Sequence, residues 1–252
     1  MHMSEYAPGL LLDQFVPTDE LVFSPSVSQR AYHHRDILGA FDSAPGRRAW
    51  DILLSTTPGP LSNQWHRNIS FPAVTTFRMR LKAVTKIDNE VRIGEIRFFN
   101  GQAELVRSSG WQIIASRNPW EIRFAFDNDQ VSWWTSGQAA DLNTWIDVDF
   151  PHPVSIDRVT VDQIEDQQWI QLNPLAHLAG TWTPLKAVAS GRLAPPALNL
   201  RMYLKDELKS MGIHWILIAD GSLGAEDLRT NSPLWGIKQV AETNGYRLWK
   251  LE

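Results

Sequence analysis

Alternation of apolar and polar residues is the clearest pattern in the middle of the chain. Residues 76–83 and 91–99 alternate in this way, and Asn100-Gly101 after the second segment is a strong signal for a tight hairpin turn. Residues 154–161 alternate as well, and short apolar segments separated by turn residues follow them. Because many short strands joined by turns are typical of antiparallel sandwiches, this pattern predicts a mainly β domain over residues 21–190.

The two ends of the chain follow other patterns. Residues 1–20 show no clear period and are expected to form an N-terminal arm. From residue 191 onward, leucines at helical spacing precede the apolar segment 214–219, and residues 246–251 alternate again. We therefore expect a small α-β-α-β region over residues 191–252, with its second helix near Pro233 to Thr243.

Composition narrows the class of function. The net charge is −4 and the chain has no block of Lys or Arg, so nucleic acid is not an expected partner. The absence of cysteine excludes disulfides and thiolate metal sites. No run approaches the roughly 18 apolar residues that a membrane-spanning helix needs. No nucleophile elbow, phosphate-binding loop or zinc-protease motif is present. We therefore predict a non-catalytic chain. A hydrolase would need two carboxylates that converge in a cleft.

One motif is more specific than its periodicity. Residues 125–136 read Ala-Phe-Asp-Asn-Asp-Gln-Val-Ser-Trp-Trp-Thr-Ser. This segment resembles the discoidin (coagulation-factor type C) signature, with Asn128 in place of Gly and Ser132 in place of Thr. Asn tolerates the left-handed backbone better than most residues, so the turn can survive the change. The resemblance implies an antiparallel, galactose-binding-like sandwich of the jelly-roll type that binds carbohydrate.

Further segments match the same family in the same order, and one does not. The matching segments are residues 145–150, 156–161 and 180–185. The hairpin-like region 78–99 is similar to the family's C-terminal hairpin but precedes the signature. Either the sandwich is permuted or extended, which we favour, or residues 21–106 end a degenerate first copy.

The resemblance also implies a structural calcium ion at the signature loop. The positions that match the ligands are Asp127, Asp129 and Ser132, and Glu95 matches the ligand that the Glu-containing strand contributes. The alternative is that Asp127 only caps the turn by accepting hydrogen bonds from backbone amides.

Tryptophan is unusually frequent, with 12 residues against 4 tyrosines. Most are expected to fill the core, and Trp134 matches the family's structural tryptophan. Several others lie in polar, loop-like surroundings, where a ring can stack on a sugar. The candidate ligand-binding residues are Trp111, Arg117, Asn118, Trp120, Trp133 and Trp169.

The tail carries a second resemblance. Residues 208–218, Trp235-Gly236-Ile237 and Tyr246 to Trp249 are similar to the soluble C-terminal region of bacterial multi-pass membrane glycosyltransferases. This resemblance implies a membrane-embedded parent protein, an extracytoplasmic location and a role in holding a cell-envelope glycan. The alternative is a protein–protein interaction or structural domain with no affinity for sugars.

Overall fold

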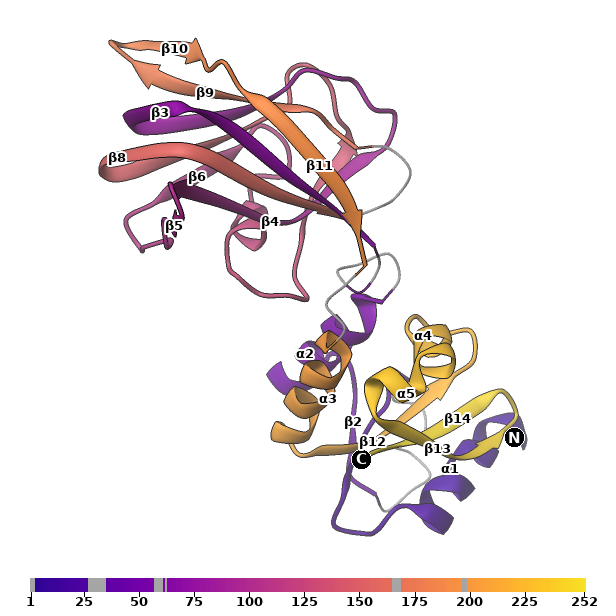
Figure 1. Cartoon of the computed structure of the whole chain (residues 1–252). Coiled ribbons are helices and arrows are strands. Elements are labelled where there is room, and N and C mark those ends of the chain that lie inside the picture. Colours follow the sequence, from indigo (N-terminus) through magenta and orange to yellow (C-terminus); the bar gives the residue numbers. More distant parts are fainter. Residues whose placement is uncertain (1–2, 27–34, 57–60, 62, 165–168, 196–198) are drawn as a thin grey trace. The chain divides into compact units, whose positions relative to one another are not determined.

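The computed structural model describes residues 3–26, 35–56, 61, 63–164, 169–195 and 199–252. The described chain is mainly β (Figure 1). It divides into two compact units. Pro58–Pro196 form one unit, which we call the sandwich unit. Met1–Thr57 and Ala197–Glu252 together form the other, which we call the α/β unit.

The sandwich unit contains one antiparallel sheet of nine strands, with the strand order β10-β9-β3-β8-β4-β5. Strand β11 also pairs with β3, β6 with β8, and β7 with β4. The strands are β3 (Gln64–Ala83), β4 (Glu90–Asn100), β5 (Ala103–Glu104), β6 (Gln112–Ala115), β7 (Trp134–Ala139), β8 (Trp145–Ile164), β9 (Leu172–Leu178), β10 (Thr181–Pro184) and β11 (Val188–Ala194). A short 3-10 helix, η2 (Ile122–Ala125), precedes the signature loop.

Two long strands join the two halves of this sheet. Strands β3 and β8 pair with each other in three stretches, because the register shifts between Ser70 and Val74 and again between Thr76 and Arg78. The first stretch of β3 also pairs with β11, and the last with β9. Ile69 from the first stretch and Met79 from the last belong to the same apolar cluster. The two halves therefore face one core, which is consistent with a β-sandwich.

The alternating segments form strands where the pattern predicted them. Residues 76–83 lie in β3, 91–99 in β4 and 154–161 in β8. Asn100 pairs with Ala103 across a two-residue turn, and Gly101 has a φ of 59°, as the predicted hairpin requires. Strands β3, β4 and β5 share one sheet with β8, so residues 64–104 belong to the same sheet as the segments that follow the signature. This agrees with the permuted or extended sandwich.

The α/β unit has a five-stranded mixed sheet with the strand order β13-β14-β12-β1-β2. Strand β1 pairs in parallel with both β12 and β2, whereas β14 pairs antiparallel with β12 and β13. The strands are β1 (Leu21–Phe23), β2 (Ile37–Leu38), β12 (Ile213–Ala219), β13 (Ile237–Thr243) and β14 (Tyr246–Leu251). The helices are α1 (Met3–Phe15), α2 (Ala44–Leu54), α3 (Leu200–Ser210), α4 (Ala225–Thr230) and α5 (Ser232–Trp235). None of the helices described is long and apolar enough to cross a membrane.

This division differs from the expected boundaries at residues 20 and 190. Residues 3–15 form helix α1 instead of an arm, and residues 21–54 belong to the α/β unit and not to the sandwich. Strand β1 has only three residues, too few to show a period, and its partner β12 lies about 190 positions later in the sequence. The sandwich unit is thus inserted between α2 and α3 of the α/β unit.

The expected second helix of the tail also differs from the structure. Only residues 232–235 of that region are helical, and Gly236, with a φ of 61°, ends the helix. The following residues form strand β13, which pairs with β14. Helical spacing alone does not reveal that Gly236 stops the helix or that β14 pairs with the residues after it. The second half of the predicted helix is therefore a strand.

Candidate functional site

A hollow of about 610 Å³ lies beside strand β4 of the sandwich unit. Strand β4 supplies one wall, and the segment from β5 to Trp111 and the loop after η2 supply the others. The lining residues are Glu95, Ile96, Arg97, Phe98, Glu104, Leu105, Val106, Arg107, Trp111, Phe126, Asp127 and Asn128. The hollow therefore combines aromatic rings with five charged side chains.

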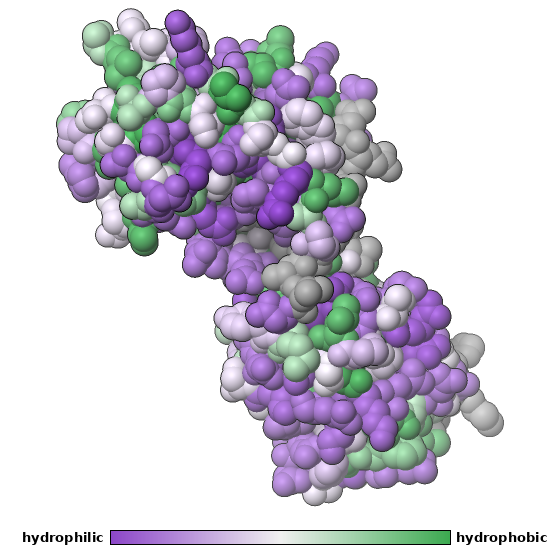
Figure 2. Space-filling view, viewed as in Figure 1, coloured by the Kyte–Doolittle hydropathy of each residue, from purple (hydrophilic) through white to green (hydrophobic). Residues whose placement is uncertain are grey.

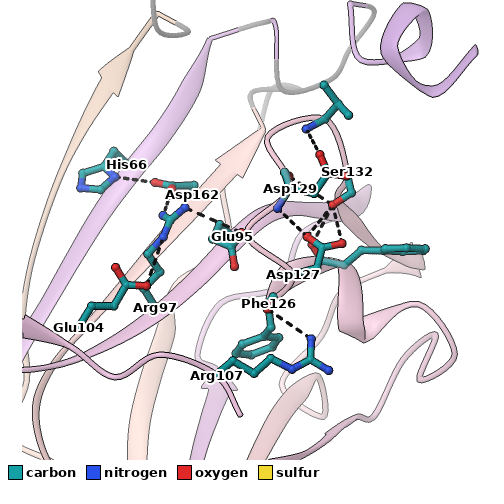
Figure 3. A network of polar contacts seen from close by, with 12 residues as sticks. His66, Glu95, Arg97, Glu104, Arg107, Phe126, Asp127, Asp129, Ser132 and Asp162 are labelled. Carbon is teal, nitrogen blue, oxygen red and sulfur yellow. Dashed lines mark hydrogen bonds and ion pairs between the residues drawn. The ribbon is translucent and has the colours of Figure 1, made fainter. Parts of the chain in front are cut away.

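The signature loop is shaped by its own side chains (Figure 3). Asn128 has a φ of 56°, so the left-handed turn expected at this position is present. The Asp127 carboxylate accepts hydrogen bonds from the Asp129 amide at 3.0 Å and from the Ser132 hydroxyl at 2.8 and 3.0 Å. The Asp129 carboxylate accepts one from the Val131 amide at 3.0 Å. Asp127 thus caps the turn, which presents its carboxylate at the hollow.

Glu95 comes from β4, and the structure brings it to the same hollow as Asp127. Its side chain is 9% exposed, and it accepts a hydrogen bond from the backbone amide of Asn128. Burial raises the pKa of Glu95 to about 7, and the nearby Asp127 carboxylate adds to this shift. Burial also raises the pKa of Asp127. Negative charge in the hollow is therefore costly.

Arg97 links the hollow to a larger polar network (Figure 3). Its guanidinium donates to Asp162 at 2.8 Å and lies 3.8 Å from both Glu95 and Glu104. Asp162 in turn lies 2.5 Å from Nδ1 of His66. Because Arg97 is shared among three carboxylates and is closest to Asp162, it compensates the charge of Glu95 only in part.

Aromatic side chains form the apolar part of the hollow. Phe98 stacks on Phe126 with ring centroids 6.4 Å apart, and it meets Trp111 edge-on at 6.0 Å. Trp111 also packs edge-on against Phe150 at 4.9 Å, so this tryptophan is partly buried against the core. Its packing fixes the ring in place, which makes Trp111 a rigid element of the wall.

Trp111 is the one predicted ligand-binding residue that lines this hollow. Arg117 pairs with Asp141 at 3.3 Å. The Asn118 side chain donates to Glu121 at 2.6 Å and to the Thr135 carbonyl at 2.9 Å. These bonds hold the segment before η2 in place.

The other three tryptophans lie elsewhere on the unit. Trp120 is 85% exposed, and Trp133 is half-buried. The Trp169 ring lies 4.3 Å from the Arg67 guanidinium and 6.3 Å from the Trp65 ring. The six predicted residues therefore do not form one site, and a ligand role for those outside the hollow remains a prediction.

The calcium prediction also remains a prediction. Three of its four residues, Asp127, Asp129 and Ser132, are bonded to one another within the loop, and Glu95 lies against it. Calcium takes six to eight oxygen ligands. Among the residues that the structure describes, no group of three or more acidic or histidine side chains could hold a metal ion. The arrangement is that of a turn cap.

Nine of the twelve residues that line the hollow were not predicted as site residues, among them Arg97, Phe98, Arg107 and Phe126. Arg97 and Phe126 carried a usable signal. Arg97 lies two positions from Glu95 on an alternating strand, which places both on one face, and Phe126 directly precedes Asp127 in the motif. Arg107 reaches the hollow only through the path of the loop after β5, which no local pattern reveals.

Comparison of the chain with protein-family models, curated proteins and solved structures finds no match.

Proposed function

We propose that the sandwich unit is a non-catalytic carbohydrate-binding module and that the hollow beside β4 is its sugar site. The observation that carries the proposal is the combination of aromatic rings with charged hydrogen-bonding groups in one hollow. Its volume of about 610 Å³ falls in the usual range for small-molecule sites. Pockets of this kind bind by apolar contact and orient the ligand through a few polar groups.

Each wall of the hollow has a role in this proposal. The partly exposed ring of Trp111 offers apolar surface to the C–H face of a sugar, and the buried ring of Phe126 forms the floor beneath it. The carboxylates of Asp127 and Glu95 and the guanidinium of Arg107 can bond to hydroxyl groups. Arg107 is already held against the loop by contacts of 3.3 Å to the Arg123 and Phe126 carbonyls, so it is preorganised.

A panel of monosaccharides and cell-envelope glycans tests the proposal by thermal shift. A ligand that binds only the folded state raises the melting temperature by mass action. We expect Trp111→Ala to abolish the shift and the matched control Trp120→Ala to keep it, because Trp120 lies outside the hollow. A shift that survives Trp111→Ala in a folded protein would refute this site.

If no sugar raises the melting temperature, the alternative of a protein–protein interaction or structural domain is favoured. On the face drawn in Figure 2, hydrophobic side chains of the sandwich unit are scattered among hydrophilic ones. A protein interface usually has a contiguous apolar centre. That face gives the alternative no support.

A second candidate function is glycoside hydrolysis, because two carboxylates meet in the hollow. Glu95, with a pKa raised to about 7, has the property of a general acid, and Asp127 would be its partner. Assays with aryl glycosides distinguish the two functions. Turnover that is lost in Glu95→Gln would establish a hydrolase, whereas binding without turnover supports the module.

We also propose that the chain belongs to the extracytoplasmic part of a membrane glycosyltransferase. The segments that carry this resemblance run from the end of α3 into β12, from α5 into β13, and along β14, and the three strands are neighbours in the sheet of the α/β unit. In this setting the module would hold an envelope glycan near the enzyme. Tighter binding of a polyprenyl-phosphate-linked sugar in detergent than of the free sugar would support this setting, and equal affinities would argue against it.

A further inference from the structure

Negative groups outnumber positive ones around the hollow. Glu95, Glu104 and Asp127 line it together with Arg97 and Arg107, so three carboxylates share the hollow with two guanidinium groups. Asp162, outside the hollow, lies between Arg97 and His66. Arg97 makes its short contact, 2.8 Å, with Asp162, and lies at 3.8 Å from Glu95. Glu95 is nevertheless more than nine-tenths buried. A buried carboxylate that is only partly compensated is costly, and a cationic ligand close to it would lower that cost.

We propose that the hollow selects a sugar that carries a free ammonium group, a hexosamine, over neutral and acidic sugars. This inference rests on the proposed carbohydrate function and names its ligand class. The ammonium group would lie between the Glu95 and Asp127 carboxylates. The sugar ring would lie against the ring of Trp111.

The surroundings suit an ammonium group better than a metal ion. An ammonium donates three hydrogen bonds and is attracted to the face of an aromatic ring, and both partners are present here. Calcium takes six to eight oxygen ligands, and within the described part of the chain no group of three or more acidic or histidine side chains could hold a metal ion.

The charge balance also argues against an acidic sugar. A carboxylate on the ligand would approach Glu95 and Asp127, two groups whose pKa values burial has already raised. Two guanidinium groups line the hollow, but Arg97 is already shared among three carboxylates and Arg107 already donates to two backbone carbonyls. Like charges at short range in a partly buried site repel strongly, so uronic acids should bind weakest.

Calorimetric titration of the full chain at about pH 7, in EDTA, tests the inference. The titrants are matched sets of free-amine hexosamine, N-acetylhexosamine, neutral hexose and uronic acid in the gluco, galacto and manno series. We expect the amine of one series to bind at least about tenfold more tightly than its N-acetyl and neutral counterparts. Glu95→Gln should abolish this preference, and Trp120→Ala should retain it.

The outcomes separate the inference from the proposed function. Equal binding of neutral, N-acetylated and amine sugars would overturn the inference and leave the carbohydrate function standing, whereas a panel with no binding would overturn both. If EDTA abolishes sugar binding and added calcium restores it, the cation of the hollow is a metal ion. That result would also overturn the inference. Asp127→Asn, which keeps the size of the side chain, repeats the test if Glu95→Gln does not fold.

Discussion

Two buried carboxylates of the sandwich unit have different surroundings. Asp147, on the face of β8 turned away from the core, is 7% exposed and accepts two hydrogen bonds from Arg80 at 2.6 and 2.7 Å. The rings of Trp145 and Trp182 each lie 4.4 Å from the Arg80 guanidinium. Glu95, at the hollow, is 9% exposed, but its nearest guanidinium nitrogen is 3.8 Å away.

The comparison separates a structural ion pair from a site. The Arg80–Asp147 pair is bidentate and enclosed by aromatic rings, so each charge has its partner and the arrangement is complete. Glu95 has similar burial with less compensation, and its pKa is raised to about 7 as a result. A residue that lowers the stability of the folded protein and lines a hollow is a candidate functional residue.

Removing Arg80 should destabilise the protein most. Arg80→Ala leaves Asp147 buried without its counter-charge and removes the contacts with both tryptophan rings. We expect the free energy of unfolding to fall by about 3 kcal/mol in urea denaturation. The control is Arg78→Ala, which breaks the more exposed pair with Asp149 and should cost less than about 1 kcal/mol. Similar losses in both variants would contradict the distinction.

Replacing Glu95 should raise the free energy of unfolding, whereas replacing Arg80 lowers it. Its pKa is raised from 4.5 to about 7, so the folded state binds the proton more tightly than the unfolded state. Stability should therefore fall as the pH rises through this window and stay level above it. Glu95→Gln should remove this dependence and, at about pH 8, raise the free energy of unfolding by up to about 3 kcal/mol.

Denaturation curves across the pH range check this second prediction. Glu104→Gln is the control, because Glu104 lines the same hollow with a side chain that is almost half exposed. It should change stability by less than about 0.5 kcal/mol at any pH. If Glu95→Gln is less stable than the original chain above about pH 7, the carboxylate is fully compensated and the comparison fails.

The smallest expected effect concerns the loop that carries Asp127. Asn128 has a φ of 56°, a conformation that Gly adopts freely and Ala does not. Asn128→Gly should leave the free energy of unfolding within about 0.5 kcal/mol, whereas Asn128→Ala should lower it by about 1 kcal/mol. Both variants keep the backbone amide that donates to Glu95, so a large loss in both would show that the Asn side chain itself holds the loop.

Much of the sandwich followed from the sequence, and so did helix α3 and strands β12 and β14 of the α/β unit, but the N-terminal part of that unit did not. Alternation in β3, β4 and β8 is visible because one face of each strand packs on the core and because these strands are long. Strands β1 and β2 have three and two residues, and their partners are set by tertiary pairing. No local pattern could therefore assign residues 21–54 to their unit.

The candidate site divides in the same way. The motif around Asp127 and the Glu95 strand were predicted to meet, and the structure brings them to one hollow. The predicted tryptophans are spread over the unit, because a polar sequence context does not fix where a ring points. Trp169, for example, lies over Arg67 and not at the hollow. The chemical groups of one motif can thus be predicted from sequence. Which loops meet at one site depends on the tertiary fold.

The most direct test of the central claim is an NMR titration that follows the indole N–H signals of the chain's 12 tryptophans as sugar is added. Single Trp→Phe variants assign the signals of Trp111 and Trp120. If the hollow beside β4 is the sugar site, the Trp111 signal shifts and saturates with the ligand while the Trp120 signal stays in place. A saturating shift at Trp120 with none at Trp111, or no shift at any tryptophan, would contradict the account.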